Sequence, residues 1–166
     1  RAIDISNHLQ SRMKYAKMLE HGMGVNRNLE EAKKFYQSIA QRCNDENKKT
    51  KARIRTAHLS YQINSSLKNK ENSCKTLKKF NNREAKYYLY ELTLDDDEET
   101  ANEYLEEAIQ QSYPKALYQA AIKEANSNDF ENAKAHLKAA VEKGLPEAMI
   151  LLGDLYFQGK LKKPHK

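Results

Sequence analysis

Apolar and small residues recur along this chain at spacings of three and four, the pattern of one face of an α-helix. Polar stretches with glycine, proline or asparagine separate these stripes and are typical of turns. The sequence therefore predicts an all-α protein of short amphipathic helices without strands. The predicted helices cover residues 8–20, 29–42, 47–63, 69–80, 83–94, 98–112, 114–126, 129–143 and 146–158.

The helical pattern repeats along the chain. Each repeat opens with a small residue, which we call its marker. Four and five positions after the marker lies a pair of residues that resembles Leu-Gly. The markers fall at intervals of 41, 33, 31 and 32 residues and are Ser11, Ala52, Ala85, Ala116 and Ala148. A second segment recurs in register with them and begins at Ala32, Ala101 and Ala133. Two segments repeated in register indicate helical hairpins in tandem, in which each hairpin touches only its neighbours.

Turn signals support these helix boundaries. Gly22 and Gly24 are expected to end the first helix, since glycine accepts the positive φ of such a turn. Pro114 and Pro146 are expected at the first position of new helices, and Asp129 is expected to be an N-cap. Each of these residues lies where the apolar periodicity starts or stops.

The second repeat is the least regular. The polar residues 44–50 read as an insertion that explains the interval of 41, and residues 64–72 read as a polar loop. Counting back from Ala85 places Cys74 at the position that Tyr36 holds in the first repeat. Cys43 and Cys74 are the chain's two cysteines, and both are expected to be ordinary thiols because no Cys-x-x-Cys or Cys/His metal spacing exists.

The best copies of the repeat resemble a known family. Residues 11–43 contain the turn Gly-Met-Gly-Val followed by Asn28 and the run Phe-Tyr-x-x-Ile-Ala, and residues 116–159 contain A-A-V-E-K-G-L-P-E-A and L-G-D-L-Y-F-Q-G. This pattern resembles the Sel-one-like (Sel1-like) repeat, a relative of the tetratricopeptide repeat, over about residues 8–160. The resemblance implies a right-handed α-solenoid of about five stacked helix-turn-helix repeats. The expected repeats are about 11–43, 52–81, 85–112, 116–144 and 148–160.

The resemblance also implies a function and a binding surface. Members of the family act as adaptors in membrane-associated complexes, and bacterial members are periplasmic or secreted, with roles in envelope or polysaccharide assembly and in host interaction. A non-enzymatic scaffold that binds a protein or peptide in a concave groove is therefore expected. In tetratricopeptide-like stacks, positions two, six and nine after each marker face the groove. Here they are Met13, Lys17, Glu20, Ile54, His58, Tyr61, Tyr87, Glu91, Leu94, Tyr118, Ile122, Ala125, Ile150, Asp154 and Phe157. The alternative is that these residues pack against the next repeat.

Charge is distributed unevenly. Residues 1–83 hold 19 Lys and Arg against 7 Asp and Glu, whereas residues 84–166 hold 10 against 16. The basic half suggests an alternative function, binding of an anionic polysaccharide or nucleic acid. Its basic residues are Lys48, Lys49, Lys51, Arg53, Arg55, Lys68, Lys70, Lys75, Lys78 and Lys79. Base stacking is disfavoured because only Tyr61 and Phe80 lie near them.

Other classes of function lack their motifs. The sequence has no Gly-rich phosphate loop, nucleophile elbow, zinc spacing or Ser/His/Asp motif, so neither catalysis nor a cofactor or metal is expected. The acidic run 95–99 is expected to favour the N-terminus of the following helix rather than to bind calcium. No run of 18 apolar residues exists, so no membrane span is expected.

Self-association is a further alternative. Leu155, Phe157 and Leu161 are predicted to be exposed on the last repeat, where they could contact a second copy. Residues 162–166 are expected to begin another turn between helices.

Overall fold

The fold is known from a computed structural model, which describes the backbone of residues 2–161 and the side chains of residues 8–161. The turn expected at residues 162–166 lies outside this range. The described residues form nine α-helices and no strand. The helices are α1 (Ala2–His21), α2 (Leu29–Arg42), α3 (Glu46–Ile63), α4 (Leu67–Leu77), α5 (Arg83–Thr93), α6 (Glu98–Gln110), α7 (Pro114–Asn126), α8 (Phe130–Glu142) and α9 (Pro146–Phe157).

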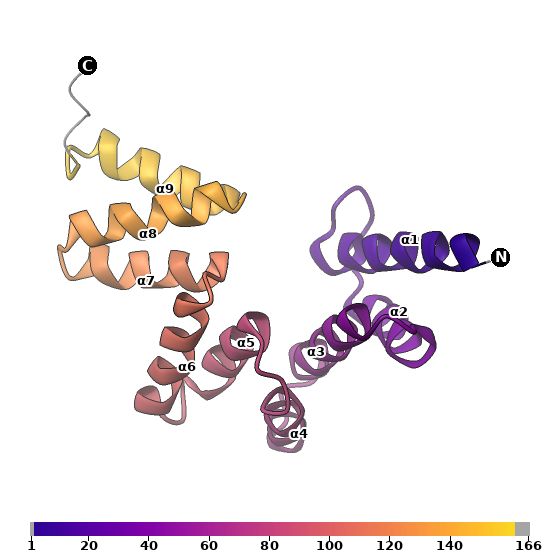
Figure 1. The fold of residues 1–166 in the computed structure, drawn as a ribbon. Helices are drawn as coiled ribbons and strands as arrows, with labels where there is room; N and C mark the ends of the chain where they lie inside the picture. Colours follow the sequence, from indigo (N-terminus) through magenta and orange to yellow (C-terminus); the bar gives the residue numbers. More distant parts are fainter. Residues whose placement is uncertain (1, 162–166) are drawn as a thin grey trace. The chain divides into compact units, whose positions relative to one another are not determined.

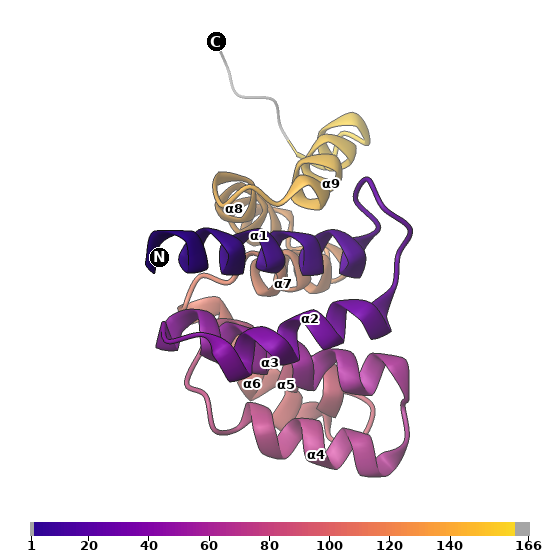
Figure 2. The ribbon, with the colours of Figure 1, turned by 90° about the vertical axis from the view of Figure 1, so that its right-hand side faces the viewer.

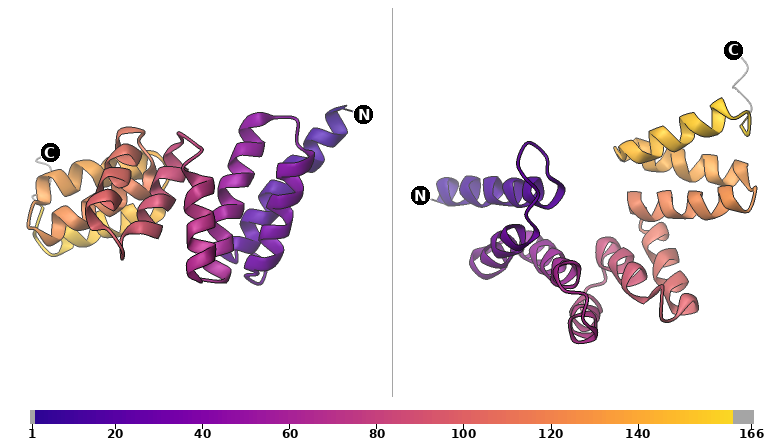
Figure 3. Two further views of the ribbon diagram at one scale, coloured as in Figure 1. Left: turned by 90° about the horizontal axis from the view of Figure 1, so that it is seen from below. Right: turned by 180° about the vertical axis from the view of Figure 1, so that it is seen from behind.

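The chain divides into two compact units, an N-terminal unit (Arg1–Phe80) with α1 to α4 and a C-terminal unit (Asn81–Lys166) with α5 to α9. Within each unit every helix packs on the next one along the chain. Figure 2 shows α1, α2, α3 and α4 as successive layers. Figures 1 and 3 show α7, α8 and α9 layered in the same way. Neighbours in sequence are thus neighbours in space, as stacked helical hairpins require.

Small residues allow these layers to approach closely. The markers Ala52, Ala85, Ala116 and Ala148 are all 0% exposed, whereas Ser11 in α1 is exposed. Alanines also occupy the buried face of the second helices, including Ala32, Ala101 and Ala133. A side chain of one methyl group leaves a hole that a large residue on the facing helix can fill. The repeated small residues therefore form the contact surface between helices.

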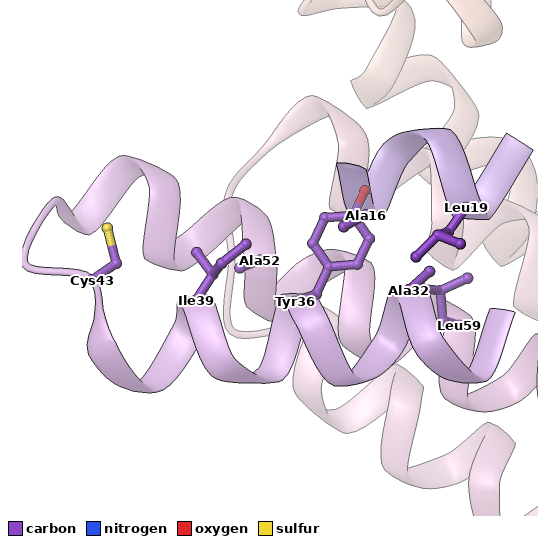
Figure 4. Close-up of a cluster of buried hydrophobic side chains, with 8 residues drawn as sticks. All are labelled: Ala16, Leu19, Ala32, Tyr36, Ile39, Cys43, Ala52 and Leu59. Carbon is purple, nitrogen blue, oxygen red and sulfur yellow. The ribbon is translucent and has the colours of Figure 1, made fainter. Parts of the chain in front are cut away.

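One side of α2 shows this packing in detail (Figure 4). Ala32, Tyr36, Ile39 and Cys43 follow each other at spacings of four, three and four, so they share a face of the helix. They form a hydrophobic cluster with residues of the two helices that flank α2, namely Ala16, Leu19, Ala52 and Leu59. This cluster forms the core between α1, α2 and α3.

Helix ends follow the expected chemistry. Gly22 and Gly24 have φ of 71° and 72° in the turn after α1, as predicted. Pro114 and Pro146 lie at the starts of α7 and α9. Asp129 is the N-cap of α8, where its side chain accepts a hydrogen bond from the Asn132 backbone N–H. The turn signals in the sequence are thus confirmed.

Three predicted features differ from the structure. The polar loop expected at residues 64–72 is shorter, because Ser66 caps α4 and the helix begins at Leu67. Helix α1 begins at Ala2 rather than residue 8, since residues 2–7 contain no glycine or proline to stop it. In α4, Ser73 and Leu77 are the buried pair, and Cys74 is only half-buried, so Leu77 rather than Cys74 corresponds to Tyr36. Leu77 precedes Ala85 by 8 residues, whereas Leu105 precedes Ala116 by 11. The shorter connection caused the error in counting.

A pair of glycine substitutions tests the roles of the turn and the helix. Gly22→Ala is expected to lower the free energy of unfolding by about 1–2 kcal/mol, because alanine is strained at φ 71°. An added Cβ would also lie 3.4 Å from Arg27 Cβ. Gly153→Ala is expected to raise the free energy of unfolding by about 0.5–1 kcal/mol, because Gly153 lies inside α9 and a Cβ added there would meet open space. Urea unfolding followed by circular dichroism measures both, and equal effects of the two changes would contradict the assignment.

Candidate partner-binding surface

The predicted groove positions lie on the first helix of each repeat, α1 and α3 in the N-terminal unit and α5, α7 and α9 in the C-terminal unit. Their exposure falls into three classes. Glu20, Ile54, His58 and Tyr87 are buried. Half-buried positions are Met13, Tyr61, Leu94, Tyr118, Ile122 and Ala125. Exposed positions are Lys17, Glu91, Ile150, Asp154 and Phe157.

Glu20 joins the first three helices through a buried network. Its carboxylate accepts a hydrogen bond from Arg55 Nη1 at 2.7 Å and another from the Tyr36 hydroxyl at 2.9 Å. The Glu20 and Arg55 side chains are only 6% and 10% exposed. Because both charges are buried and paired, the network positions α1, α2 and α3 and leaves Glu20 unavailable to a partner. This pairing was not predicted from the sequence.

Tyr87 lies in a group of aromatic side chains in the C-terminal unit. Its ring centroid is 5.3 Å from that of Tyr113, 5.9 Å from that of Tyr90 and 6.2 Å from that of Tyr88. Burial raises the pKa of Tyr87 strongly, and the nearby Glu91 carboxylate adds to the rise. Burial also raises the pKa of Tyr90. Both phenols are thus held neutral by a packed environment.

This environment makes the C-terminal unit sensitive to alkali. A raised phenol pKa stabilises the fold below the unfolded pKa of about 10, and this contribution is lost as pH rises through the folded pKa. Ionisation of Tyr87 and Tyr90, followed by tyrosinate absorbance, is expected to coincide with loss of helicity. In Tyr87→Phe the decline of the unfolding free energy above about pH 10 should be shallower. Full ionisation of all tyrosines with unchanged helicity would contradict this prediction.

Among the predicted groove positions, the most accessible apolar ones lie on α9. Ile150 is 66% and Phe157 94% exposed, and their spacing of seven residues places them on one face of the helix. Leu155 and Leu161, also predicted to be exposed, are buried at 4% and 3% and belong to the hydrophobic cluster that α7, α8 and α9 share. The prediction was wrong for these two leucines because Leu155 and, beyond the end of α9, Leu161 both pack against residues of α7 and α8.

The basic cluster is less available than the sequence suggested. Arg55 is buried against Glu20. Lys48 and Lys49 form ion pairs with Asp45 and Glu46 in the first turn of α3. The remaining cations are spread over α3, α4 and the turn that follows α4. Three of the ten predicted basic residues are therefore paired with carboxylates of the chain itself, and the others are distributed over two helices and a turn.

The acidic run contributes to a helix cap. Asp97 is the N-cap of α6, and its carboxylate accepts hydrogen bonds from the Thr100 hydroxyl and backbone N–H. These hydrogen bonds lower the pKa of Asp97. Within residues 8–161, no three His, Cys, Asp or Glu side chains are grouped as a metal site would require. Cys43 is buried, and neither cysteine forms a disulfide in the described part of the chain.

None of the helices that the structure describes combines the length and the apolar character needed to cross a bilayer.

Comparison with solved structures identifies proteins of the same fold. A Sel1 repeat protein from Oxalobacter formigenes superposes with a TM-score of 0.59 and 20% identity, over 98% of this chain and 69% of that chain. The antigen c5321, a protective antigen of uropathogenic Escherichia coli with an SLR fold, superposes with a TM-score of 0.57 and 19% identity. That match covers 92% of this chain and 34% of the antigen, so the chain spans about a third of its length. No family model and no curated protein matches the sequence.

Proposed function

We propose that this chain, an all-α solenoid with the Sel1-like repeat fold, is a non-enzymatic scaffold that binds a protein or peptide partner. The observation that supports this function most directly is the accessible apolar face of α9. Ile150 and Phe157 project large side chains into solvent from a helix whose other side is packed. Large exposed apolar residues on one face are the usual anchors of protein interfaces.

The half-buried positions of α7 extend this proposal. Tyr118 and Ile122 are part of the same predicted register and keep some accessible surface. Aromatic residues contribute strongly to binding because they bury a large area with little loss of conformational freedom. The proposed partner surface of the C-terminal unit therefore comprises Tyr118, Ile122, Ile150 and Phe157, with Glu91 and Asp154 as polar members.

The compartment and biological setting belong to the same proposal. The resemblance of the repeats to the Sel1-like family is the basis for proposing a role in envelope assembly or host interaction, and a protective antigen of uropathogenic Escherichia coli has the same fold. An adaptor of this kind requires a partner and no chemical step. A periplasmic or secreted scaffold is the form of the function that we favour.

Selection of peptides tests the scaffold function. Random peptides displayed on phage are selected on the immobilised chain, and the enriched peptides are measured in solution by fluorescence anisotropy. Replacing both Ile150 and Phe157 by serine is expected to weaken binding by about 30-fold or more. This is the loss expected if at least one of the two is a strong anchor. Leu67→Ser, which changes a leucine that is 76% exposed on α4, is the matched control and should leave affinity unchanged.

The same variants separate the scaffold from self-association. Light scattering on the free chain shows whether α9 is occupied by a second copy, and serine substitutions would then produce monomers. Failure to enrich any peptide, or equal affinity for the double variant and the wild type, would contradict the proposed surface. Circular dichroism confirms that each variant keeps its helices.

A further inference from the structure

The N-terminal unit contains a cleft, lined by hydroxyl, amide and alanine side chains and one arginine, that lies outside the predicted groove positions. Helices α2, α3 and α4 enclose it, and its volume is about 350 Å³. On α3 the cleft uses Arg53, Thr56, Ala57 and Ser60, whereas the predicted groove uses other residues of the same helix. The remaining lining residues are Ala40, Asn69, Asn72, Ser73 and Thr76.

The hydroxyl groups of the cleft are acceptors. Thr56 and Ser60 donate their protons to carbonyl oxygens of their own helix, each at 2.8 Å. Ser73 donates to Ala57 O and Thr76 to Asn72 O, again at 2.8 Å. Their protons are therefore used internally, and their oxygens can accept hydrogen bonds from a ligand. Such a lining favours a ligand that supplies N–H donors.

Arg53 gives the cleft a positive charge. No carboxylate lines the cleft, and the exposed Arg53 makes no hydrogen bond or close ion pair within residues 8–161, although its charge contributes, after that of Lys49, to the lowered pKa of Glu46. The Asn72 side-chain amide makes no internal hydrogen bond in this same range and supplies a further donor. Both groups line the same cleft, and a guanidinium suits a carboxylate, which can accept two parallel hydrogen bonds from it.

The surroundings select for an acidic partner. Helices α3 and α4 together contain eight Lys and Arg, of which Arg55 is buried against Glu20 and Lys48 and Lys49 pair with Asp45 and Glu46. The other five, Lys51, Arg53, Lys68, Lys70 and Lys75, outnumber the one further acid of the two helices, Glu71. A surface of this charge attracts acidic segments and increases their rate of association. A phosphate-rich ligand fits less well, because it has no N–H groups to donate to the hydroxyl oxygens, whereas the backbone of a polypeptide does. No aromatic residue lines the cleft to stack a base.

We propose that the cleft between α2, α3 and α4 binds an acidic side chain of a partner polypeptide, with the carboxylate on Arg53 and backbone N–H groups on the hydroxyl oxygens. This inference rests on the proposed scaffold function and adds a second contact surface and a chemical class of partner. A volume of about 350 Å³ accommodates one such residue with part of its backbone.

A titration of the full chain with a blocked peptide tests this inference. The probe is the pentapeptide Gly-Ala-Glu-Ala-Gly, and its isostere has Gln in place of Glu. Followed by NMR of the isotope-labelled chain, the Glu peptide is expected to shift amide signals of Thr56, Ser60 and Asn72. The Gln peptide should bind about tenfold more weakly, because a charge-assisted pair is replaced by a neutral one.

A matched pair of variants identifies the cation. Arg53→Gln should weaken the Glu peptide about tenfold. Lys51→Gln removes the same charge from an exposed neighbour outside the cleft and should change affinity by less than about twofold. Equal losses in the two variants would show diffuse attraction and overturn the proposal.

Other outcomes are equally decisive. Absence of binding, or signal shifts confined to other helices, would overturn the cleft assignment. Tighter binding of inorganic phosphate or of an oligonucleotide at the same residues would also overturn it, in favour of a phosphate site. If selected peptides still depend on Ile150 and Phe157 while the Glu peptide does not bind, the scaffold function stands and this inference alone fails.

Discussion

Replacing Arg55 by alanine is expected to lower the free energy of unfolding by about 3–5 kcal/mol. The substitution leaves the Glu20 carboxylate buried without its cation, because the two side chains meet at 2.7 Å with little exposure to water. The Tyr36 hydroxyl would still donate a hydrogen bond to that carboxylate but carries no charge to balance it. A buried charge without a partner is among the largest single defects that a fold can carry. Urea unfolding of the full chain measures the loss.

Two controls make the Arg55 prediction specific. Arg53→Ala, two residues away on the same helix but exposed, should change stability by less than about 0.5 kcal/mol. Combining Glu20→Ala with Arg55→Ala should cost less than the sum of the single changes, because neither charge is then left alone. Additive losses would show that the two side chains act independently and that the ion pair does not join the helices.

The helices were predictable because their signals are local. Spacing of apolar residues, proline at the first helical position and glycine after the last turn act over a few residues, and α2 and α7 have the predicted bounds. The repeats also predicted which residues are buried between helices, since residues in equivalent positions of a repeat pack in equivalent ways. The markers from Ala52 to Ala148 are all fully buried for this reason. The error at Cys74 arose where the repeat length changed.

Exposure of the candidate surface was harder to predict. It depends on which helices pack against each repeat, and the position of a residue within its repeat does not specify this. Ile54 and Ile150 hold the same position of their repeats, yet they are 0% and 66% exposed. Helix α3 packs between α2 and α4, whereas α9 packs on α8 within the described residues. Pairing of Glu20 with Arg55, 35 residues later, likewise depends on tertiary contacts. The signal for this pair in the sequence was the position of a charged residue, Glu20, within an apolar stripe.

Tyr87→Ala is expected to lower the free energy of unfolding by about 3–5 kcal/mol, the range for removing a large buried aromatic side chain. Tyr87 is 7% exposed, and its ring lies 5.3 Å from that of Tyr113 and 5.9 Å from that of Tyr90. Its removal would leave a cavity in the aromatic group and lose those ring contacts. Thermal and urea unfolding followed by circular dichroism measure the effect.

Tyr118 provides the matched comparison, because it holds the same position in the next repeat but is only half-buried. Tyr118→Ala should cost about 1–2 kcal/mol, since less area returns to water on unfolding. Tyr87→Phe keeps the ring and should cost less than Tyr87→Ala. If Tyr87→Ala instead left stability unchanged while abolishing peptide binding, Tyr87 would be an anchor of the partner surface and not a residue of the core. The two tyrosines therefore separate the contributions of one repeated position to packing and to binding.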